Sequence, residues 1–167
     1  RRYGSKCLHG GEAKEMKRFY DALPDPFFDG APACIIVGAG DVGDYQIEVQ
    51  KDDLVIAADG GLSHVKKLGL VPDIILGDFD SLGFTPSGAN VFPVEKDDTD
   101  AMLAVRRGLA EGYREFLLYG SLDGPRLDHT VANFQTLQFI ADHGGVGYLV
   151  GHRTVATVIK NTTLTLE

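Results

Sequence analysis

Short apolar runs alternate with amphipathic segments along most of this chain. The apolar runs are rich in branched aliphatic residues and are bounded by glycine or polar residues, which is typical of strands buried on both faces of a sheet. The predicted strands are residues 33–37, 54–58, 73–76, 91–94, 115–119, 146–150 and 154–159. The predicted helices are residues 44–50, 62–68, 98–110 and 127–142, and apolar residues recur at roughly helical spacing in the last of these.

This alternation predicts an α/β fold. Repeated strand–helix–strand units build a mostly parallel sheet with helices on both faces, a Rossmann-like three-layer arrangement. We expect residues 31–152 to form this domain and residues 1–30 to be a leader with a short helix. Two β-branched runs after residue 153 break the rhythm, so residues 153–167 are expected to begin a C-terminal β domain that is mostly absent from this sequence.

Composition narrows the class of protein. The 167 residues are enough for one domain with a substantial core. A net charge of −8 argues against nucleic acid as the main partner. Only two cysteines are present, which favours a reducing compartment, and we expect a cytoplasmic protein. No apolar run has the length that spans a bilayer, so no membrane partner is expected.

Aspartates gather in three short clusters, each placed after a predicted strand or at the start of a predicted helix. They are Asp78 and Asp80 in G-D-F-D-S, Asp97, Asp98 and Asp100 in K-D-D-T-D, and Asp128 in R-L-D-H-T. In an open α/β sheet these positions converge on the edge where ligands bind. Two unit charges about 4 Å apart repel by roughly 4 kcal/mol at an effective dielectric near 20. The clusters therefore predict a compensating cation, and oxygen ligands of this kind point to Mg²⁺ carrying phosphates.

Each cluster also has an ordinary structural interpretation. Asp78 and Asp80 are two residues apart and face the same way in extended chain, although aspartate is also common in turns. Asp97 and Asp100 lie on one side of the first turn of a helix, and we assign them to the site. Capping needs one acid at most, so Asp98 is assigned to capping or to solvent.

A third group surrounds the start of the helix at 127–142. Arg126 precedes this helix, and its planar guanidinium group can bind two phosphate oxygens at once. His129 and Asn133 are one turn apart on the helix, next to Asp128. The simpler interpretation of His129 is a surface histidine, but its neighbours favour a ligand contact.

Two glycine motifs follow predicted strands. Asp59, Gly60 and Gly61 form a strand end that allows close approach of a nucleotide, and the same residues also suit a tight turn. Gly38, Gly40 and Gly43 form G-x-G-x-x-G, which fits a dinucleotide fingerprint with Asp59 on the ribose. Asp41 and Asp44 would place negative charge beside the pyrophosphate, so we favour a turn or a loop near ATP.

The motifs together resemble the catalytic domain of thiamin pyrophosphokinase. The strings P-D-I-I-L-G-D-F-D-S, K-D-D-T-D and R-L-D-H-T-V-A-N occur in this order, with A-D-G-G upstream, and the resemblance covers about residues 34–151. It implies an ATP-binding α/β domain followed by a β-sandwich. It also implies transfer of pyrophosphate from ATP to the hydroxyl of thiamine, giving thiamine pyrophosphate and AMP, by a homodimer.

The resemblance also implies roles for individual residues. The catalytic acids would be Asp78, Asp80, Asp97, Asp100 and Asp128. Mg²⁺ would be held by Asp78, Asp80, Asp100 and Asp128. Nucleotide contacts would come from Asp59, Gly60, Gly61, Arg126, His129 and Asn133.

Three alternatives stay open at this point. The same acids would serve a pyrophosphokinase with another acceptor, such as a hydroxymethylpterin. The glycine loop would instead serve a nicotinamide-dinucleotide-binding oxidoreductase. A non-catalytic nucleotide-binding domain would bind ATP without turnover of any acceptor.

Overall fold

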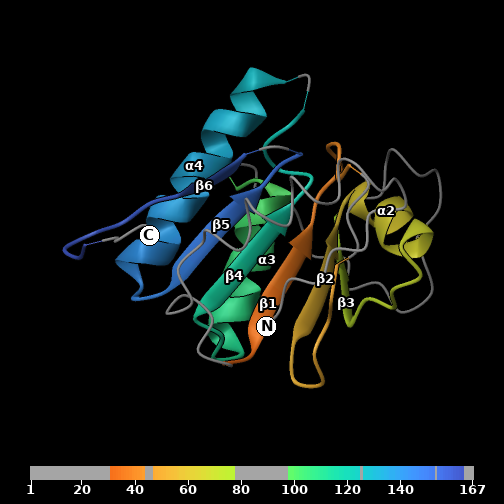
Figure 1. The fold of residues 1–167 in the computed structure, drawn as a ribbon, viewed down its shortest axis with the longest axis horizontal. Coiled ribbons are helices and arrows are strands. Elements are labelled where there is room, and N and C mark those ends of the chain that lie inside the picture. Colours follow the sequence, from red (N-terminus) through yellow and green to blue (C-terminus); the bar gives the residue numbers. More distant parts are fainter. Residues whose placement is uncertain (1–30, 44–46, 78–97, 125, 153, 164–167) are drawn as a thin grey trace, which may run out of the picture.

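The computed structural model describes residues 31–43, 47–77, 98–124, 126–152 and 154–163. In this part of the chain the strands form one sheet in the order β3-β2-β1-β4-β5-β6 (Figure 1). The predicted elements within residues 1–30 and the predicted strand at 91–94 lie outside the described residues, as do Asp78, Asp80 and Asp97.

The strands follow the predicted pattern closely. Their bounds are β1 Ala33–Val37, β2 Leu54–Ala58, β3 Ile74–Leu76, β4 Glu115–Tyr119, β5 Val146–Val150 and β6 Val155–Thr157. Neighbouring strands from β3 to β5 pair in parallel, and only β5 and β6 pair antiparallel among the described strands. A mostly parallel sheet with flanking helices confirms the predicted α/β class.

The described helices are α2 Gly61–Lys67, α3 Asp100–Ala110 and α4 Leu127–Asp142. They cover the two faces of the sheet (Figure 1). On one face, α2 packs through Leu62 and Val65 into a core with Ile35 and Val37. On the other face, α3 and α4 pack against alternate residues of the same strands, and this core includes Cys34, Ile36, Val105, Phe116, Leu137 and Ile140. The central strands are buried on both faces, which explains their continuous apolar runs.

Helix ends agree with their sequence signals. The hydroxyl of Thr99 accepts a hydrogen bond from the amide of Met102 at 3.2 Å, so Thr99 is the cap of α3. Gly69 and Gly112 follow α2 and α3 with φ of 71° and 95°. That backbone conformation favours glycine and ends a helix.

Two expectations differ from the structure. A helix was predicted at 44–50, but the described residues 47–50 are not helical. Instead Ile47 is buried in the core and the amide of Gln50 donates to Asp53 Oδ2 at 2.8 Å, so core packing and a local turn determine this segment. The run at 154–159 was expected to belong to a following β domain. Its middle part, β6, extends the main sheet, while the domain boundary itself stays a prediction.

None of the helices in the described part of the chain has the length and apolar character that crossing a bilayer requires.

Candidate functional site at the carboxyl edge of the sheet

The strand order creates a switch point between β1 and β4. These strands are neighbours, yet the chain leaves β1 toward β2 and leaves β4 toward β5, on opposite sides. In open α/β sheets, ligands bind at the carboxyl ends of the strands beside such a point. The first turns of α4 project beyond this edge in Figure 1.

The loops after β1 and β4 are fastened together at the switch point. The amide of Gly38 donates to the carbonyl of Tyr119 at 2.8 Å, and the amide of Gly40 donates to the carbonyl of Gly120 at 2.9 Å. A Cβ atom on Gly40 would lie 2.5 Å from the Gly120 oxygen. Glycine is required here because the two backbones touch.

This contact explains the G-x-G-x-x-G motif. A dinucleotide fingerprint needs amides free to face a pyrophosphate and a helix that starts at the motif. The amides of Gly38 and Gly40 already bond to backbone carbonyls, and no helix occupies the described residues 41–43 and 47–50. The geometry therefore favours a packing turn over a nicotinamide site.

Asp59, Gly60 and Gly61 join the end of β2 to the start of α2. Asp59 has φ of 48°, a left-handed conformation that is uncommon outside glycine, and its amide donates to the carbonyl of Leu76 at 2.7 Å. A Cβ atom on Gly61 would lie 1.8 Å from the carbonyl oxygen of Val37. The motif is thus a tight turn at the carboxyl edge, and its nucleotide contact stays a prediction.

Asp100 is the first residue of α3. The other end of this helix lies at the amino edge of the sheet, because the hydroxyl of Tyr113 donates to the carbonyl of Asp52 just before β2. An 11-residue helix rises about 16 Å, roughly the length of a five-residue strand. The start of α3 therefore lies at the carboxyl edge, as predicted for Asp100.

Arg126 and Asp128 form a bidentate ion pair at the start of α4. The distances are 2.6 Å from Arg126 Nη2 to Asp128 Oδ2 and 3.3 Å from Nε to Oδ1. The bond from Arg126 holds the pKa of the Asp128 carboxyl below its usual value, and the same bond raises the pKa of Arg126. Both side chains are exposed, at 63% and 64%, so the pair is accessible to ligands.

His129 and Asn133 meet different surroundings although they are one turn apart. His129 is exposed, whereas Asn133 is buried and its amide group donates to the carbonyl of Ser121 at 2.6 Å. Thr130 on the same helix donates to the carbonyl of Leu122 at 3.3 Å. Asn133 and Thr130 thus hold the loop that leads from β4 to Arg126.

Two contacts near this edge have no signal in the local sequence. Asp98 pairs with Arg106 on α3 instead of capping the helix or facing solvent, and the distance is 2.8 Å. Asp123 accepts a hydrogen bond from the backbone amide of His152, which ties the loop after β4 to the loop after β5. Neither partner is close in sequence, so no local pattern reveals these contacts.

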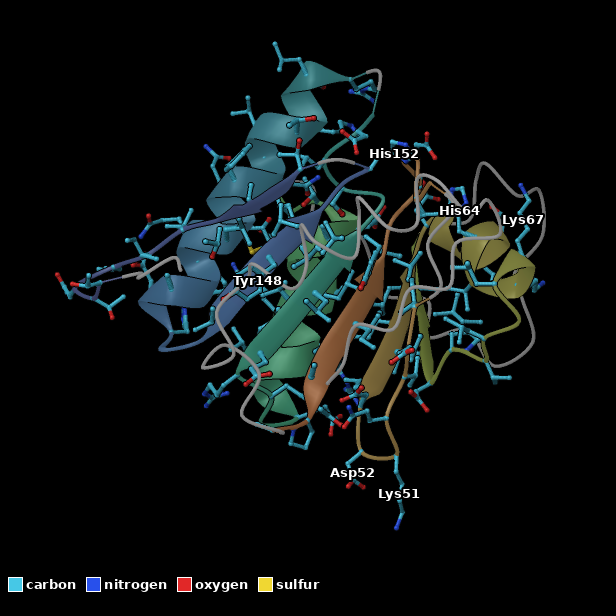
Figure 2. The ribbon with its side chains drawn as sticks, in the orientation of Figure 1. Lys51, Asp52, His64, Lys67, Tyr148 and His152 are labelled. Carbon is cyan, nitrogen blue, oxygen red and sulfur yellow. The ribbon has the colours of Figure 1, made fainter. Side chains whose placement is uncertain are left out.

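Figure 2 shows labelled residues at the two opposite ends of the sheet. His64 on α2 and His152 after β5 lie toward the carboxyl edge, whereas Lys51 and Asp52 lie at the opposite end. The structure thus places Asp59, Asp100, Arg126 and Asp128 at one edge, while their roles stay predictions. Within the described residues, no three His, Cys, Asp or Glu side chains come together to hold a metal ion.

Comparison with known proteins gives the same family. The family model for the catalytic domain of thiamin pyrophosphokinase matches residues 45–144. The thiamine pyrophosphokinase of Bacillus subtilis is similar at 26% identity and a TM-score of 0.61, over 72% of this chain and 60% of that chain. The thiamin pyrophosphokinase of Geobacillus thermodenitrificans is similar at 28% identity and a TM-score of 0.58, over 69% and 58%. The chain spans about three fifths of the length of these solved structures. No curated protein matches it.

Proposed function

The chain belongs to the thiamin pyrophosphokinase catalytic-domain family, and from this premise we propose that the full-length protein transfers pyrophosphate from ATP to the hydroxyl of thiamine. The products are thiamine pyrophosphate and AMP. One observation carries the proposal: the matched region contains all three aspartate clusters, and the described site acids of these clusters, Asp100 and Asp128, lie at the carboxyl edge beside the switch point. We also propose a cytoplasmic homodimer as the working form.

The proposed step is a displacement at phosphorus. The thiamine hydroxyl oxygen forms a bond to the β-phosphorus of ATP, and the bond from that phosphorus to the bridging α,β oxygen breaks. AMP leaves with the bridging oxygen. The proton of the hydroxyl passes to a carboxylate, Asp97 or Asp100. Reactions of this type depend mainly on positioning and on neutralising charge.

Mg²⁺ is the cofactor that we propose, and when bound it would neutralise part of the negative charge of the phosphates. Asp78, Asp80, Asp100 and Asp128 would hold it. Asp100 and Asp128 alone do not complete a set of ligands, and Asp78 and Asp80 lie outside the described residues.

The pair of Arg126 and Asp128 suits a site that binds a triphosphate. An exposed ion pair contributes little to stability, so it opens at little cost. The guanidinium group of Arg126 can donate the same two N–H groups to phosphate oxygens that it donates to Asp128. Binding of nucleotide would let Arg126 turn to phosphate and release Asp128 for its role as an acid. Asp59, Gly60, Gly61, His129 and Asn133 are proposed to line or support the nucleotide pocket.

Replacement of Asp100 tests the proposal directly. In the full-length protein, Asp100→Ala should lower AMP formation from ATP plus thiamine by about a hundredfold or more, because a positioned acid or base contributes 10²–10⁴-fold. Asp52→Ala is the matched control, since Asp52 is exposed at the opposite edge (Figure 2). Both variants are compared with the wild type by coupled AMP assay and by thermal unfolding.

Turnover of Asp100→Ala at the wild-type rate would remove Asp100 from the reaction. Assay of the wild type with a hydroxymethylpterin in place of thiamine separates the two acceptor classes. ATP binding without turnover of either acceptor would contradict the proposed enzyme and favour a non-catalytic nucleotide-binding domain.

A further inference from the structure

Asp98 is joined to α4 through Arg106. Asp98 Oδ2 lies 2.8 Å from Arg106 Nε, and the guanidinium carbon of Arg106 lies 4.6 Å from the centre of the Phe139 ring on α4. The Asp98 side chain is only 17% exposed, although it lies just outside the end of a helix. We call Asp98, Arg106 and Phe139 the α3–α4 clamp.

The clamp reaches along the helix. Arg106 is eight residues beyond Asp98, which corresponds to about 12 Å along a helix axis. Helix side chains lean toward the N-terminus, so a long arginine can extend back to the segment that enters α3. This segment is held at two points, by the Thr99 cap and by the clamp.

We propose that Asp98 is a positioning residue that, through Arg106 and Phe139, sets the direction in which α3 presents Asp100. The inference rests on the proposed function of Asp100. Asp98 directly precedes the Thr99 cap, and Asp100 directly follows it, so a shift of this segment moves Asp100. Arg106 also neutralises the charge of Asp98, which would otherwise repel its acidic neighbours.

The same helix offers a matched control. Arg107 Nη2 lies 2.5 Å from Glu111 Oε1, and the two side chains are 43% and 44% exposed. This pair resembles the clamp in its chemistry, but it joins the last turn of α3 to the C-cap residue of the same helix. Arg107→Met removes an arginine and an ion pair without touching the clamp.

Kinetics of four variants of the full-length protein test the inference: Asp98→Ala, Arg106→Met, their combination, and Arg107→Met. We expect each clamp variant to lower kcat about tenfold with KM for ATP and thiamine within about twofold, because misplacing an acid weakens mainly the transition state. The combined variant should be no worse than the single ones. Arg107→Met should stay within about twofold of the wild type. If Asp98→Ala does not fold, Asp98→Asn replaces it.

Three results would overturn the inference. An unchanged kcat in the clamp variants would reduce the clamp to a stabilising contact. A loss in Asp98→Ala that exceeds the loss in Arg106→Met by tenfold or more would mean that Asp98 itself touches substrate or metal. Additive losses in the combined variant would show that the two residues act separately.

Hydrogen exchange gives a readout that does not depend on activity. The amides of Met102 and Leu103 bond to Thr99, at 3.2 Å to its hydroxyl and 3.0 Å to its carbonyl. We expect these amides to exchange about tenfold faster in Arg106→Met and at the wild-type rate in Arg107→Met. Equal acceleration in both variants contradicts the clamp. Selective acceleration in a protein that forms no AMP from ATP plus thiamine supports the clamp and contradicts the proposed function instead.

Discussion

At the scale of the residue, the role of a polar side chain depends on what its polar atoms contact. Asn133 bonds to the carbonyl of Ser121 in the interior, whereas His129 one turn earlier faces solvent. Spacing along a helix gives the direction of a side chain, but it does not say where the helix leaves the sheet. The first turn of α4 projects beyond the strands, so only the later residue is buried (Figure 1).

Cys34 gives a residue-scale prediction for alkaline pH. Burial, and secondarily the charge of Asp53, raises the pKa of its thiol well above the usual value. The unfolded thiol ionises above pH of about 8.5, while the folded thiol stays neutral. The contribution of the Cys34 thiol to the free energy of unfolding is therefore complete below that pH, and it is lost as the pH rises. We expect the free energy of unfolding of the wild type to fall more steeply than that of Cys34→Ala, by up to about 1.4 kcal/mol per pH unit.

Urea unfolding at several values between pH 8 and pH 10.5 measures this difference. The slopes with pH are compared, since the absolute stabilities also differ by the cavity that alanine leaves. Tyr148, whose pKa is raised mainly by burial, contributes to both proteins alike. Parallel slopes for the two proteins would contradict the prediction.

At the scale of the element, α2 starts directly against the end of β1. The position of Gly61 leaves no room for a side chain, because a Cβ atom would lie 1.8 Å from the carbonyl oxygen of Val37 and 2.6 Å from its carbon. The obstacle is backbone in the central strand of the sheet, which cannot move cheaply. The second glycine of A-D-G-G is thus required by packing, whatever its role toward a nucleotide.

We therefore expect Gly61→Ala to destabilise the protein by about 3 kcal/mol or more, as overpacking against rigid backbone does. Gly124→Ala is the control, since a Cβ atom there meets nothing within 4 Å. It should change stability by no more than about 0.5 kcal/mol. Chemical denaturation of both variants checks the expectation, and equal stabilities would refute the close approach of α2 to β1.

The bounds of the elements show which parts of the fold the sequence alone predicts. Strands β1, β2, β4 and β5 and helix α4 have the predicted bounds, because strongly apolar runs and a long periodic segment carry local information. Residues 47–50 and β6 differ because tertiary contacts fix them. In the site, the position of Asp100 follows from the order of elements. The pairing of Asp98 with Arg106 does not, since the two residues are eight apart and Arg106 also contacts Phe139 of α4.

At the scale of the whole molecule, acids at the two ends of the sheet have different surroundings. At the amino edge, both carboxylate oxygens of Asp53 accept backbone amides, from Ala33 and from Gln50, each at 2.8 Å. Asp73 at the same edge accepts the amide of Val55 at 2.8 Å. At the carboxyl edge, Asp128 pairs instead with the exposed side chain of Arg126. Asp53 and Asp73 at one end of the sheet thus complete backbone hydrogen bonding, whereas Asp128 at the other end is held by a side chain and stays exposed.

This division predicts opposite effects of equivalent substitutions. Asp53→Ala removes the acceptor of the amide of Ala33, a fully buried residue, and we expect the free energy of unfolding to fall by about 2–3 kcal/mol. Its kcat/KM, measured well below the unfolding temperature, should stay within about twofold of the wild type.

Asp100→Ala should show the reverse, a large loss of turnover with a change in stability of about 1 kcal/mol or less. Since both variants remove one carboxylate from the same chain, net charge cannot explain a difference between them. A loss of turnover in Asp53→Ala as large as that in Asp100→Ala would mean that the two ends of the sheet are not functionally distinct.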